Sequence, residues 1–360
     1  MQTAPAAEPA LHVVARRMLL ERPLTAIARR VSPAFSTTEV RAQVVELRRE
    51  TPRATTVILE PNHLWKGFRA GQFAPVTFEV RGVRTTRSYS FSSAPSEAGR
   101  LSITVARHPE GKVSRFVNDR LAVGTVVTVG PAAGQLVLPS EPGPVLLVAG
   151  GSGVTPMRSL ALDLASRGRL GQAVLLHDAR TEDDLIFARE FRALADRTPG
   201  FVYLARTTGG DDPAARLNAD RFASLVPDFA ARTTVACGPF GFVRMIEGAF
   251  EDAGARAKLR TESFTPPVVA TDSEAPAASV TLRRSGIRFE ADSRRSLLVQ
   301  AEAAGAQPKS GCRMGICHTC TCTKRSGTVL NLLTGQVSSE PDQAVQLCIS
   351  AALSEVDLDV

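Results

Sequence analysis

Five of the six cysteines of this 360-residue chain lie within 37 residues near its carboxyl end. Cys312, Cys317 and Cys320 follow the spacing C-x4-C-x2-C, and Cys348 comes after 27 intervening residues. This is the spacing of the plant-type [2Fe–2S] ligand set, in which each iron takes two protein sulfurs and two bridging sulfides. Four thiolates in this pattern therefore predict an iron–sulfur centre.

A four-cysteine zinc site is the competing interpretation. Zinc ribbons favour two C-x2-C pairs, whereas one spacing here is x4 and the fourth cysteine stands alone. Gly311 and Gly315 would let the backbone turn and bring amide N–H groups close to the sulfurs. Cys322 lies two residues beyond the third ligand, so in an extended segment its side chain should point elsewhere. We expect a [2Fe–2S] cluster without Cys322 as a ligand.

Length and composition indicate a globular protein of several domains. At roughly 150 residues per domain, the chain should form two to three domains. Its 44% hydrophobic and 22% charged residues are ordinary values, and no apolar run reaches the roughly 18 residues of a spanning helix. The net charge of +7 is spread as arginine along the chain, which argues against nucleic-acid binding. The start, MQTAPAAEPA, lacks the features of a secretion signal, so we expect a cytoplasmic location.

The amino-terminal third contains an extension and a β-rich segment. Residues 1–36 are arginine-rich and predict either an arm for peripheral membrane or partner contact, or an extension packed on the first domain. Residues 37–140 show short alternating runs, the last at 125–138, with one helical stretch near 113–121. This spacing predicts an antiparallel β-barrel.

The remaining chain predicts two further domains. In residues 141–265 apolar strands alternate with helical patterns, one of them at 182–195, which predicts an α/β domain with a doubly wound parallel sheet. Residues 266–278 are a Pro/Ala-rich linker. Residues 279–360 combine a hairpin, a helix at 296–305 and the cysteine segment, as an α+β domain.

A glycine-rich turn follows the apolar strand VLLVA and opens a helix. The residues suited to a pyrophosphate are Gly150, Gly151, Gly153, Thr155 and Pro156. The glycines would let the backbone approach the phosphates, Thr155 can cap the helix, and the helix N-terminus favours anions. Pro156 stands where the G-x-G-x-x-G fingerprint has its third glycine, so the standard ribose contacts of that fingerprint are not expected.

Two segments of the barrel carry residues suited to a flavin. They are Arg87, Ser88, Tyr89 and Ser90 on a strand, and Gly111, Lys112, Val113 and Ser114 at the start of a helix. Arg87 would supply a cation for a phosphate, Tyr89 an aromatic surface, and Ser90 a hydroxyl near flavin N5, while the helix N-terminus would face the phosphates. By itself, Tyr89 would be interpreted as a core aromatic of the barrel.

Together these motifs resemble the ferredoxin-NADP reductase superfamily. The strand and helix segments match its R-x-Y-S and G-x-x-S flavin motifs, the glycine turn resembles its nicotinamide-nucleotide motif, and the cysteine segment looks like the β-grasp fold of plant-type ferredoxins. The resemblance implies that Cys237, Gly238 and Pro239 form the nicotinamide-proximal turn and that Glu262 reaches back toward the flavin. It implies Ser90, Cys237 and Glu262 as catalytic residues, and FAD in preference to FMN.

The order of these domains implies an electron-transfer reductase, in which NAD(P)H gives a hydride to the flavin and single electrons pass to the cluster and on to a protein acceptor. The run at residues 63–73 and the arginine-rich start are most similar to reductases of fatty-acyl desaturases, so a di-iron desaturase is the expected partner. The alternatives are a ring-hydroxylating or steroid oxygenase.

Two other classes of function and the choice of nucleotide stay open. The protein could be a redox sensor that binds the same cofactors without turnover, or a hydride-transferring enzyme that uses its cluster structurally. Arg180 and Arg206 follow the second and third strands of the α/β domain and could clamp a 2′-phosphate, which favours NADPH over NADH. Both could equally be solvated surface residues.

Overall fold

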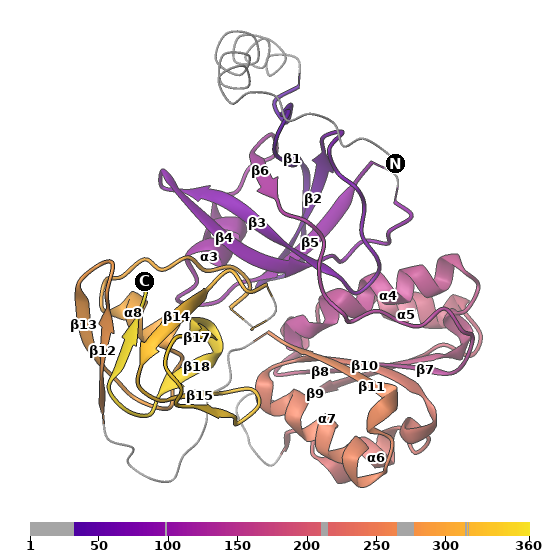
Figure 1. The fold of residues 1–360 in the computed structure, drawn as a ribbon. Coiled ribbons are helices and arrows are strands. Elements are labelled where there is room, and N and C mark those ends of the chain that lie inside the picture. Colours follow the sequence, from indigo (N-terminus) through magenta and orange to yellow (C-terminus); the bar gives the residue numbers. More distant parts are fainter. Residues whose placement is uncertain (1–31, 98, 210–214, 265–276, 314, 316) are drawn as a thin grey trace, which may run out of the picture.

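The computed structural model describes residues 32–97, 99–209, 215–264, 277–313, 315 and 317–360. The chain builds three parts in succession, each around its own sheet (Figure 1). Most of the predicted amino-terminal arm, residues 1–31, and most of the predicted linker lie outside the described residues. Within the described ranges, no helix combines the length and apolar character needed to cross a membrane.

The first part is a six-stranded antiparallel sheet in the order β4-β3-β6-β1-β2-β5. Its elements are β1 (Arg41–Thr51), β2 (Ala54–Pro61), β3 (Phe73–Val80), β4 (Val83–Ser90), β5 (Leu101–Ala106), α3 (Lys112–Asp119) and β6 (Val126–Val129). A bridge between Phe91, directly after β4, and Ile103 in β5 joins the two edge strands, so the sheet closes as a barrel. Val113 and Val117 bury α3 against the barrel core.

The second part is a parallel sheet in the order β11-β10-β7-β8-β9. Its elements are β7 (Val145–Gly150), α4 (Val154–Ser166), β8 (Ala173–Ala179), α5 (Ala188–Arg197), β9 (Val202–Thr207), α6 (Ala219–Leu225), β10 (Thr233–Gly238), α7 (Phe240–Asp252) and β11 (Leu259–Ser263). Alternate residues of β7 face opposite layers: Leu147 packs with α4 and α5, and Leu146 packs with α6 and α7 (Figure 1). Because every pairing is parallel, the carboxyl ends of the strands share one edge.

The third part is a small mixed sheet, β13-β12-β19-β14-β17, beside a short one, β16-β15-β18. Its elements are β12 (Ala278–Leu282), β13 (Ile287–Ala291), α8 (Leu297–Ala303), β14 (Thr321–Ser326), β15 (Val329–Asn331), β16 (Val337–Ser338), β17 (Gln343–Gln346), β18 (Ser350–Ala352) and β19 (Val356–Leu358). Lys324 is fully buried in this core, where its ammonium donates to the carbonyls of Gly327 at 2.7 Å and Glu340 at 2.5 Å. The predicted combination of barrel, parallel sheet and small α+β domain is confirmed.

Two predicted elements are shorter than expected. The run at 125–138 forms a strand only over Val126–Val129, because Pro131 has no N–H to continue the pairing. The helix expected at 182–195 begins at Ala188, because Phe187 adopts a left-handed backbone, φ 65°, and packs its ring in the core. Residues 182–184 form a separate 3₁₀ turn.

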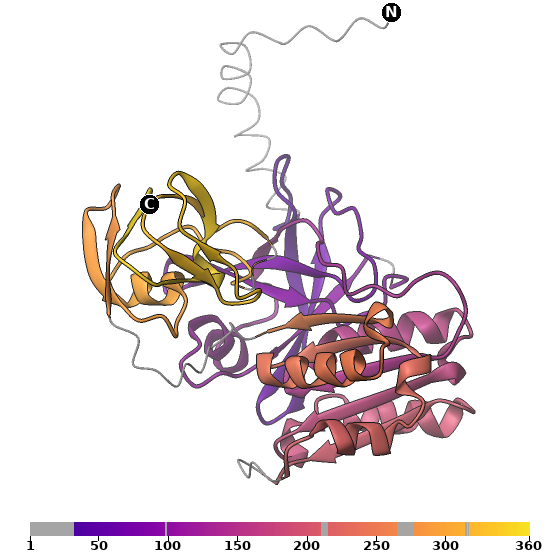
Figure 2. The same cartoon turned by 60° about the horizontal axis from the view of Figure 1, so that its bottom comes forward.

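The three parts meet near the middle of the molecule. Ala70 and Leu136 of the first part belong to the same buried cluster as the residues of α4, and Arg158 of α4 donates to the Ser92 carbonyl at 2.5 Å. The third part lies against the barrel in both views (Figures 1 and 2). There the loop before β14 comes close enough to β4 for Arg313 to influence Arg87 electrostatically.

Candidate functional site

The four predicted cluster cysteines form two pairs. Cys312 and Cys317 exchange hydrogen bonds, since each backbone N–H donates to the other sulfur at 3.1 and 3.2 Å. Cys320, directly before β14, is paired with Cys348 in the turn after β17, and the hydrogen bond from Cys348 lowers the pKa of Cys320 to about 6. One pair therefore lies within a single loop, and the other joins that loop to a distant turn.

The backbone around these sulfurs is shaped by glycine. A side chain on Gly311 would place its Cβ 2.7 Å from the Cys317 sulfur, and Gly315 adopts φ +79°. Arg313 and His318 also have left-handed φ values, 61° and 54°, so the loop turns sharply several times. This tight wrapping brings amide N–H groups onto the sulfurs, which is the environment that iron–sulfur clusters use to tune their potential.

The donor set fits a [2Fe–2S] cluster. Four thiols in two pairs match two irons with two protein sulfurs each, whereas one zinc ion needs its ligands around a single point. Across the part of the chain that is described, no three Cys, His, Asp or Glu side chains surround one point closely enough to hold a single ion. Cys322 is half-buried in β14 against the core, and burial raises its pKa to about 12.

The R-x-Y-S segment occupies the end of β4, an edge strand of the barrel that pairs with β3. The hydroxyls of Ser88 and Ser90 are buried and have no hydrogen-bond partner among the described residues. Tyr89 packs edge-on against Phe78, with 6.2 Å between ring centroids, and burial raises its pKa. Arg87 is half-buried and donates to the adjacent Thr86 carbonyl at 2.8 Å. Unpaired buried hydroxyls beside a half-buried cation fit a polar, anionic ligand such as a flavin.

The second predicted flavin segment opens α3. Gly111 is the N-cap and supplies no side-chain cap, so the first N–H groups of the helix stay available to an anion. Ser114 is already engaged, because its hydroxyl donates to the Gly111 carbonyl at 3.2 Å and accepts from the His108 N–H at 3.1 Å. Lys112 begins the helix, and Val113 is buried in the barrel core. The backbone and Lys112 are therefore the groups that remain for a phosphate.

The glycine-rich turn joins the carboxyl end of β7 to α4. Gly151 takes φ +54°, and a Cβ on Gly153 would lie 2.1 Å from the Cys237 carbonyl oxygen, so helix and strand approach more closely than a larger residue allows. The prediction that Thr155 caps the helix is wrong: Gly153 is the N-cap, and Thr155 is buried in the first turn, donating to the Ser152 carbonyl at 3.0 Å. Pro156 lies in that first turn as expected.

The turn Cys237-Gly238-Pro239 packs directly against the glycine turn. A Cβ on Gly238 would lie 3.1 Å from the Cα of Gly150, and one on Gly150 would lie 3.0 Å from Pro239. Strands β7 and β10 are neighbours, which is why two segments far apart in sequence form one surface at the carboxyl edge of the sheet. That edge is where open α/β sheets bind ligands.

Glu262 lies beside Cys237. The two residues are register partners in the parallel strands β10 and β11, and both are buried. The Glu262 Oε1 has no partner among the described residues, and burial raises the pKa of this carboxyl to about 7. Burial, together with the nearby Glu262 carboxyl, raises the pKa of the Cys237 thiol. The pair therefore offers a neutral thiol and a carboxyl that can hold or release a proton near neutral pH.

Sequence reasoning missed His177, which lies at the end of β8 behind the glycine turn. Its ring is fully buried, its Nδ1 lies 3.2 Å from the Tyr203 hydroxyl, and burial lowers its pKa to about 4, so the imidazole is neutral. The only available signal was a histidine closing the otherwise apolar run AVLLH.

The two candidate 2′-phosphate arginines differ in the structure. Arg206 pairs with Asp178 at 2.7 Å, is only 18% exposed and also donates to the Ala215 carbonyl. Arg180 is 62% exposed, with its guanidinium 3.7 Å from Asp184. The charge of Arg206 is already neutralised, so Arg180 is the more available cation.

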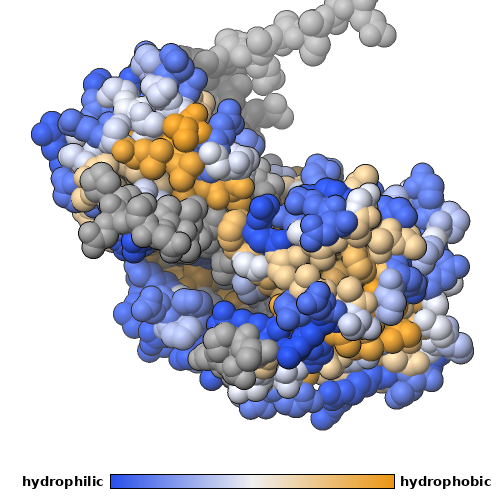
Figure 3. All heavy atoms as spheres, turned by 90° about the horizontal axis from the view of Figure 1, so that it is seen from below, coloured by the Kyte–Doolittle hydropathy of each residue, from blue (hydrophilic) through white to orange (hydrophobic). Residues whose placement is uncertain are grey.

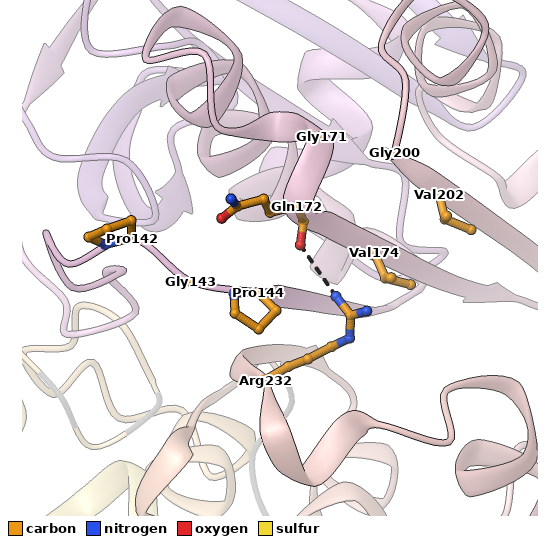
Figure 4. Close-up of a pocket in the computed structure, with 9 residues that line it drawn as sticks. All are labelled: Pro142, Gly143, Pro144, Gly171, Gln172, Val174, Gly200, Val202 and Arg232. Atoms are coloured by element: carbon orange, nitrogen blue, oxygen red, sulfur yellow. Dashed lines mark hydrogen bonds between the residues drawn. The ribbon is translucent and has the colours of Figure 1, made fainter.

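A cavity of about 490 Å³ lies away from all of these motifs (Figure 4). Its lining includes Pro144, Val174 and Val202, at the amino ends of β7, β8 and β9. Arg232 crosses it to donate to the Gln172 carbonyl at 3.3 Å. It opens at the edge of the sheet opposite to the glycine turn, so we assign it no part in the site.

Three family models match successive segments of the chain. They are the oxidoreductase FAD-binding domain over residues 45–137, the oxidoreductase NAD-binding domain over 147–248, and the 2Fe-2S iron-sulfur cluster binding domain over 280–353. Each segment contains the motif that predicted it.

Similar proteins share the whole arrangement. An "NADPH oxidoreductase" of Mycobacterium tuberculosis is 35% identical, over 91% of this chain and 86% of its own length. A "glycine betaine monooxygenase reductase subunit" of Chromohalobacter salexigens is 29% identical, over 81% and 87%. A solved structure titled phthalate dioxygenase reductase, "a modular structure for electron transfer from pyridine nucleotides to [2Fe-2S]", aligns with a TM-score of 0.63 at 25% identity, over 90% of this chain and 98% of that one.

Proposed function

Since the chain belongs to the ferredoxin-NADP reductase-like family, whose members here join FAD-binding, NAD-binding and [2Fe–2S] domains, we propose that it is the reductase component of an iron-dependent oxygenase. Its activity is electron transfer from NAD(P)H by way of FAD to a [2Fe–2S] cluster. The names of a monooxygenase reductase subunit and a dioxygenase reductase among its relatives support an oxygenase as acceptor. The expected fatty-acyl desaturase has no support in these names, so the oxygenase alternative replaces it.

The observation that carries the proposal is the succession of three motifs, each within the segment that the corresponding FAD-binding, NAD-binding or 2Fe-2S family model matches. When bound, FAD supplies two-electron hydride acceptance and the cluster supplies one-electron transfer. Cys312 and Cys317 would hold one iron, and Cys320 and Cys348 would hold the other. The residues of the protein otherwise position these groups and exclude water from them.

In the flavin site, the end of β4 would orient the ring system. Ser88 and Ser90 have buried hydroxyls free to donate to or accept from the flavin, and Arg87 would pair with a phosphate. Lys112 and the first N–H groups of α3 would add further positive charge. Tyr89, held by Phe78, would form an aromatic wall.

In the nucleotide site, the glycine turn and the N-terminus of α4 would bind the pyrophosphate of NAD(P)H. His177, neutral and buried behind this turn, would hold the turn in place without adding charge. Cys237 would line the nicotinamide site as a neutral group. Glu262 would carry its proton at a carboxylate oxygen below about pH 7 and release it above.

Steady-state turnover with two electron acceptors tests the proposal. The holoprotein should reduce cytochrome c, a one-electron protein acceptor, rapidly and repeatedly with NADPH or NADH, and should also reduce ferricyanide. A redox sensor would give no sustained turnover. An enzyme with a purely structural cluster would keep cytochrome c reduction when the cluster is lost, so that result would overturn the proposed electron path.

A further inference from the structure

We propose that Arg158, one turn into α4, is a positioning residue for hydride transfer, because it fixes the nucleotide-binding turn of the second part against the flavin-binding strand of the first. The inference rests on the proposed function, since it takes NAD(P)H and FAD as the groups that must meet. In this step the C4–H bond of the nicotinamide breaks and the hydride, with both electrons, passes to N5 of the flavin, so that NAD(P)H is oxidised and the flavin is reduced. The reacting atoms must approach to roughly 3–3.5 Å, so a small shift of one part against the other slows the transfer.

Arg158 lies where the second part meets the barrel. Helices α4 and α5 cover the face of the parallel sheet that is turned toward the barrel (Figure 1), and the barrel residues Ala54 and Ala70 share one buried cluster with them. Arg158 follows Val154, the first residue of α4, by one turn, and its side chain is only 11% exposed. The glycine turn ends where this helix begins, so a constraint on α4 is also a constraint on the proposed pyrophosphate site.

Three contacts hold the Arg158 guanidinium. Its Nη1 donates to the Ser92 carbonyl of the first part at 2.5 Å, and its Nε donates to Glu190 of α5 at 2.7 Å. Its guanidinium carbon lies 4.9 Å from the centre of the Phe187 ring, within the range of a cation–π contact. A planar guanidinium can serve a carbonyl, a carboxylate and an aromatic face at once, which a lysine ammonium cannot do in a fixed geometry. Arg158 therefore joins α4, α5 and the barrel at one point.

The groups at both ends of this contact are themselves held in place. Phe187 is buried and takes a left-handed backbone, φ 65°, which a bulky residue rarely adopts without support. On the barrel side Ser92 is fully buried, and its hydroxyl lies 3.0 Å from the Ser102 hydroxyl and 2.9 Å from that of Thr104, both in β5. A hydrogen bond between two rigid elements fixes their relative orientation more precisely than one to a loop.

Ser92 and Arg158 are also close in sequence to the two proposed cofactor sites. Ser92 follows Ser90, the last residue of the R-x-Y-S segment, by two positions, and Phe91 between them is fully buried. Arg158 follows Pro156, in the first turn of α4, by two positions. One hydrogen bond and two short segments thus connect the proposed flavin site to the proposed nucleotide site.

The charge of Arg158 is balanced by Glu190 in a partly buried place. The two side chains are 11% and 29% exposed, so removing one of them would leave the other charge unpaired away from bulk water. The ion pair between Arg53 of the first part and Asp184 of the second is longer, at 3.8 Å, and Arg53 is 60% exposed. Such an exposed pair contributes little. Arg158 is therefore the charged residue expected to fix the two parts against each other.

The experiment separates alignment from nucleotide binding. Anaerobic stopped-flow mixing of the holoprotein with NADPH, and separately with NADH, gives the limiting rate of flavin reduction and the nucleotide concentration at half of that rate. Wild type is compared with Arg158→Gln, Arg158→Lys, Glu190→Gln and the double variant Arg158→Gln/Glu190→Gln. The matched control is Arg167→Gln at the C-cap of the same helix, where Arg167 pairs with Asp163 at 2.9 Å and is 54% exposed.

We expect Arg158→Gln to lower the limiting rate about tenfold, because a misplacement of about 1 Å can cost as much as about a hundredfold. The half-saturating nucleotide concentration should change less than about twofold, since the residues proposed to bind the nucleotide remain. Arg158→Lys, which keeps the charge but loses the fork geometry, should recover part of the rate. Glu190 acts through Arg158 in this proposal, so the double variant should be no slower than Arg158→Gln. Arg167→Gln should match wild type.

Hydrogen exchange in full-length protein stripped of flavin gives a second measurement that does not depend on turnover. Arg158→Gln should speed amide exchange several-fold in peptides that cover residues 91–94 and 185–190, on the two sides of the contact, because the hydrogen bond that joins them is lost. Peptides that cover β7 should exchange as in wild type.

Equal limiting rates in wild type and Arg158→Gln would overturn the inference and leave the proposed function intact. Faster exchange in β7 as well would also overturn it, because a general loss of stability would then explain the slower flavin reduction. A wild-type holoprotein whose flavin is reduced by neither nucleotide would instead refute the proposed function, on which the inference rests.

Discussion

Replacing Glu262 by Gln should remove a pH dependence from the stability of the nucleotide-binding part. The side chain is only 6% exposed, its Oε1 has no partner among the described residues, and burial raises its pKa from 4.5 to about 7. A buried carboxyl that is easier to protonate when folded binds more protons in the folded state than in the unfolded state. Glutamine has nearly the same shape and cannot ionise.

The sign and size follow from the two pKa values. The stabilisation from Glu262 protonation is fully present below the unfolded pKa of 4.5 and is lost as the pH rises through the folded pKa of about 7. The difference of roughly 2.5 units amounts to about 3 kcal/mol over the whole range. Between about pH 5.5 and about pH 8, the linkage relation lowers the free energy of unfolding by about 2 kcal/mol. The equilibrium constant for opening of this part of the chain is then roughly thirtyfold larger.

The buried thiol of Cys237 is a local probe for this opening, because it pairs in register with Glu262 and is 0% exposed. Its rate of labelling by a disulfide reagent, resolved by peptide mass spectrometry, reports transient opening of this part of the chain even if the three domains unfold separately. After correction for thiol ionisation in the open state, the wild-type opening constant should rise about thirtyfold between these pH values. The Glu262→Gln constant should stay nearly level.

If the opening constants of wild type and Glu262→Gln changed with pH in the same way, the reasoning would be refuted. The Glu262 carboxyl would then not have a higher pKa in the folded state than in the unfolded state. A wild-type opening constant that falls as the pH rises would refute the sign. Neither result could be attributed to altered thiol chemistry, because the same thiol is measured in both proteins.

Three further predictions address the cluster, the nucleotide and the acceptor. Cys348→Ser should abolish the EPR signal of the reduced cluster and lower the rate of cytochrome c reduction at least tenfold, while ferricyanide reduction persists. Loss of both cytochrome c and ferricyanide reduction would contradict a role of Cys348 confined to the cluster. Arg180→Gln should raise the KM for NADPH about tenfold without changing that for NADH, whereas equal effects on both nucleotides would remove the 2′-phosphate contact. Leu333 is 38% exposed and lies within contact of the Gly315 position in the cysteine loop. Leu333→Asp should therefore slow cytochrome c reduction several-fold, whereas the control Leu225→Asp, at a site 37% exposed in α6, should not. Equal rates for Leu333→Asp and wild type would exclude this face as the docking surface.

The apolar surface behind the last of these predictions is visible on the third part in Figure 3. In or beside the short sheet β16-β15-β18 of this part, Leu333, Val337 and Leu353 are 38%, 53% and 39% exposed. An electron that enters the cluster from the flavin must leave toward a partner by another face. An apolar patch beside the cysteine loop is the kind of surface that a transient protein partner covers.

The parts of the site that were predictable from sequence depend on local spacing. The cysteine ligands follow from intervals within one loop, and the glycine turn follows from the pattern of strand, turn and helix, because neighbours in sequence set both geometries. The count of four thiolates predicts two protein sulfurs for each iron, but not that Cys320 pairs with Cys348, which the structure adds. The confirmed succession of barrel, parallel sheet and small mixed sheet likewise follows from the period of the hydrophobic residues.

The parts that were not predictable depend on contacts between distant segments. Arg206 was a candidate phosphate ligand, but parallel register places it beside Asp178 on the next strand, and no interval in the sequence reveals that pair. Thr155 has the side chain of a helix cap, yet the close approach of Gly153 to β10 starts the helix earlier.

Unpaired buried polar atoms connect these observations. Among the described residues such atoms occur in Ser88, Ser90, Ser159, Arg169, His177, Glu262, Ser293 and Arg313. Three of these, Ser88, Ser90 and Glu262, lie on β4 or β11, where the sequence motifs indicate a flavin. Each such atom costs roughly 1–3 kcal/mol when it has no partner. A ligand that satisfied them would recover several kcal/mol, so flavin binding should stabilise the first two parts together and not the barrel alone.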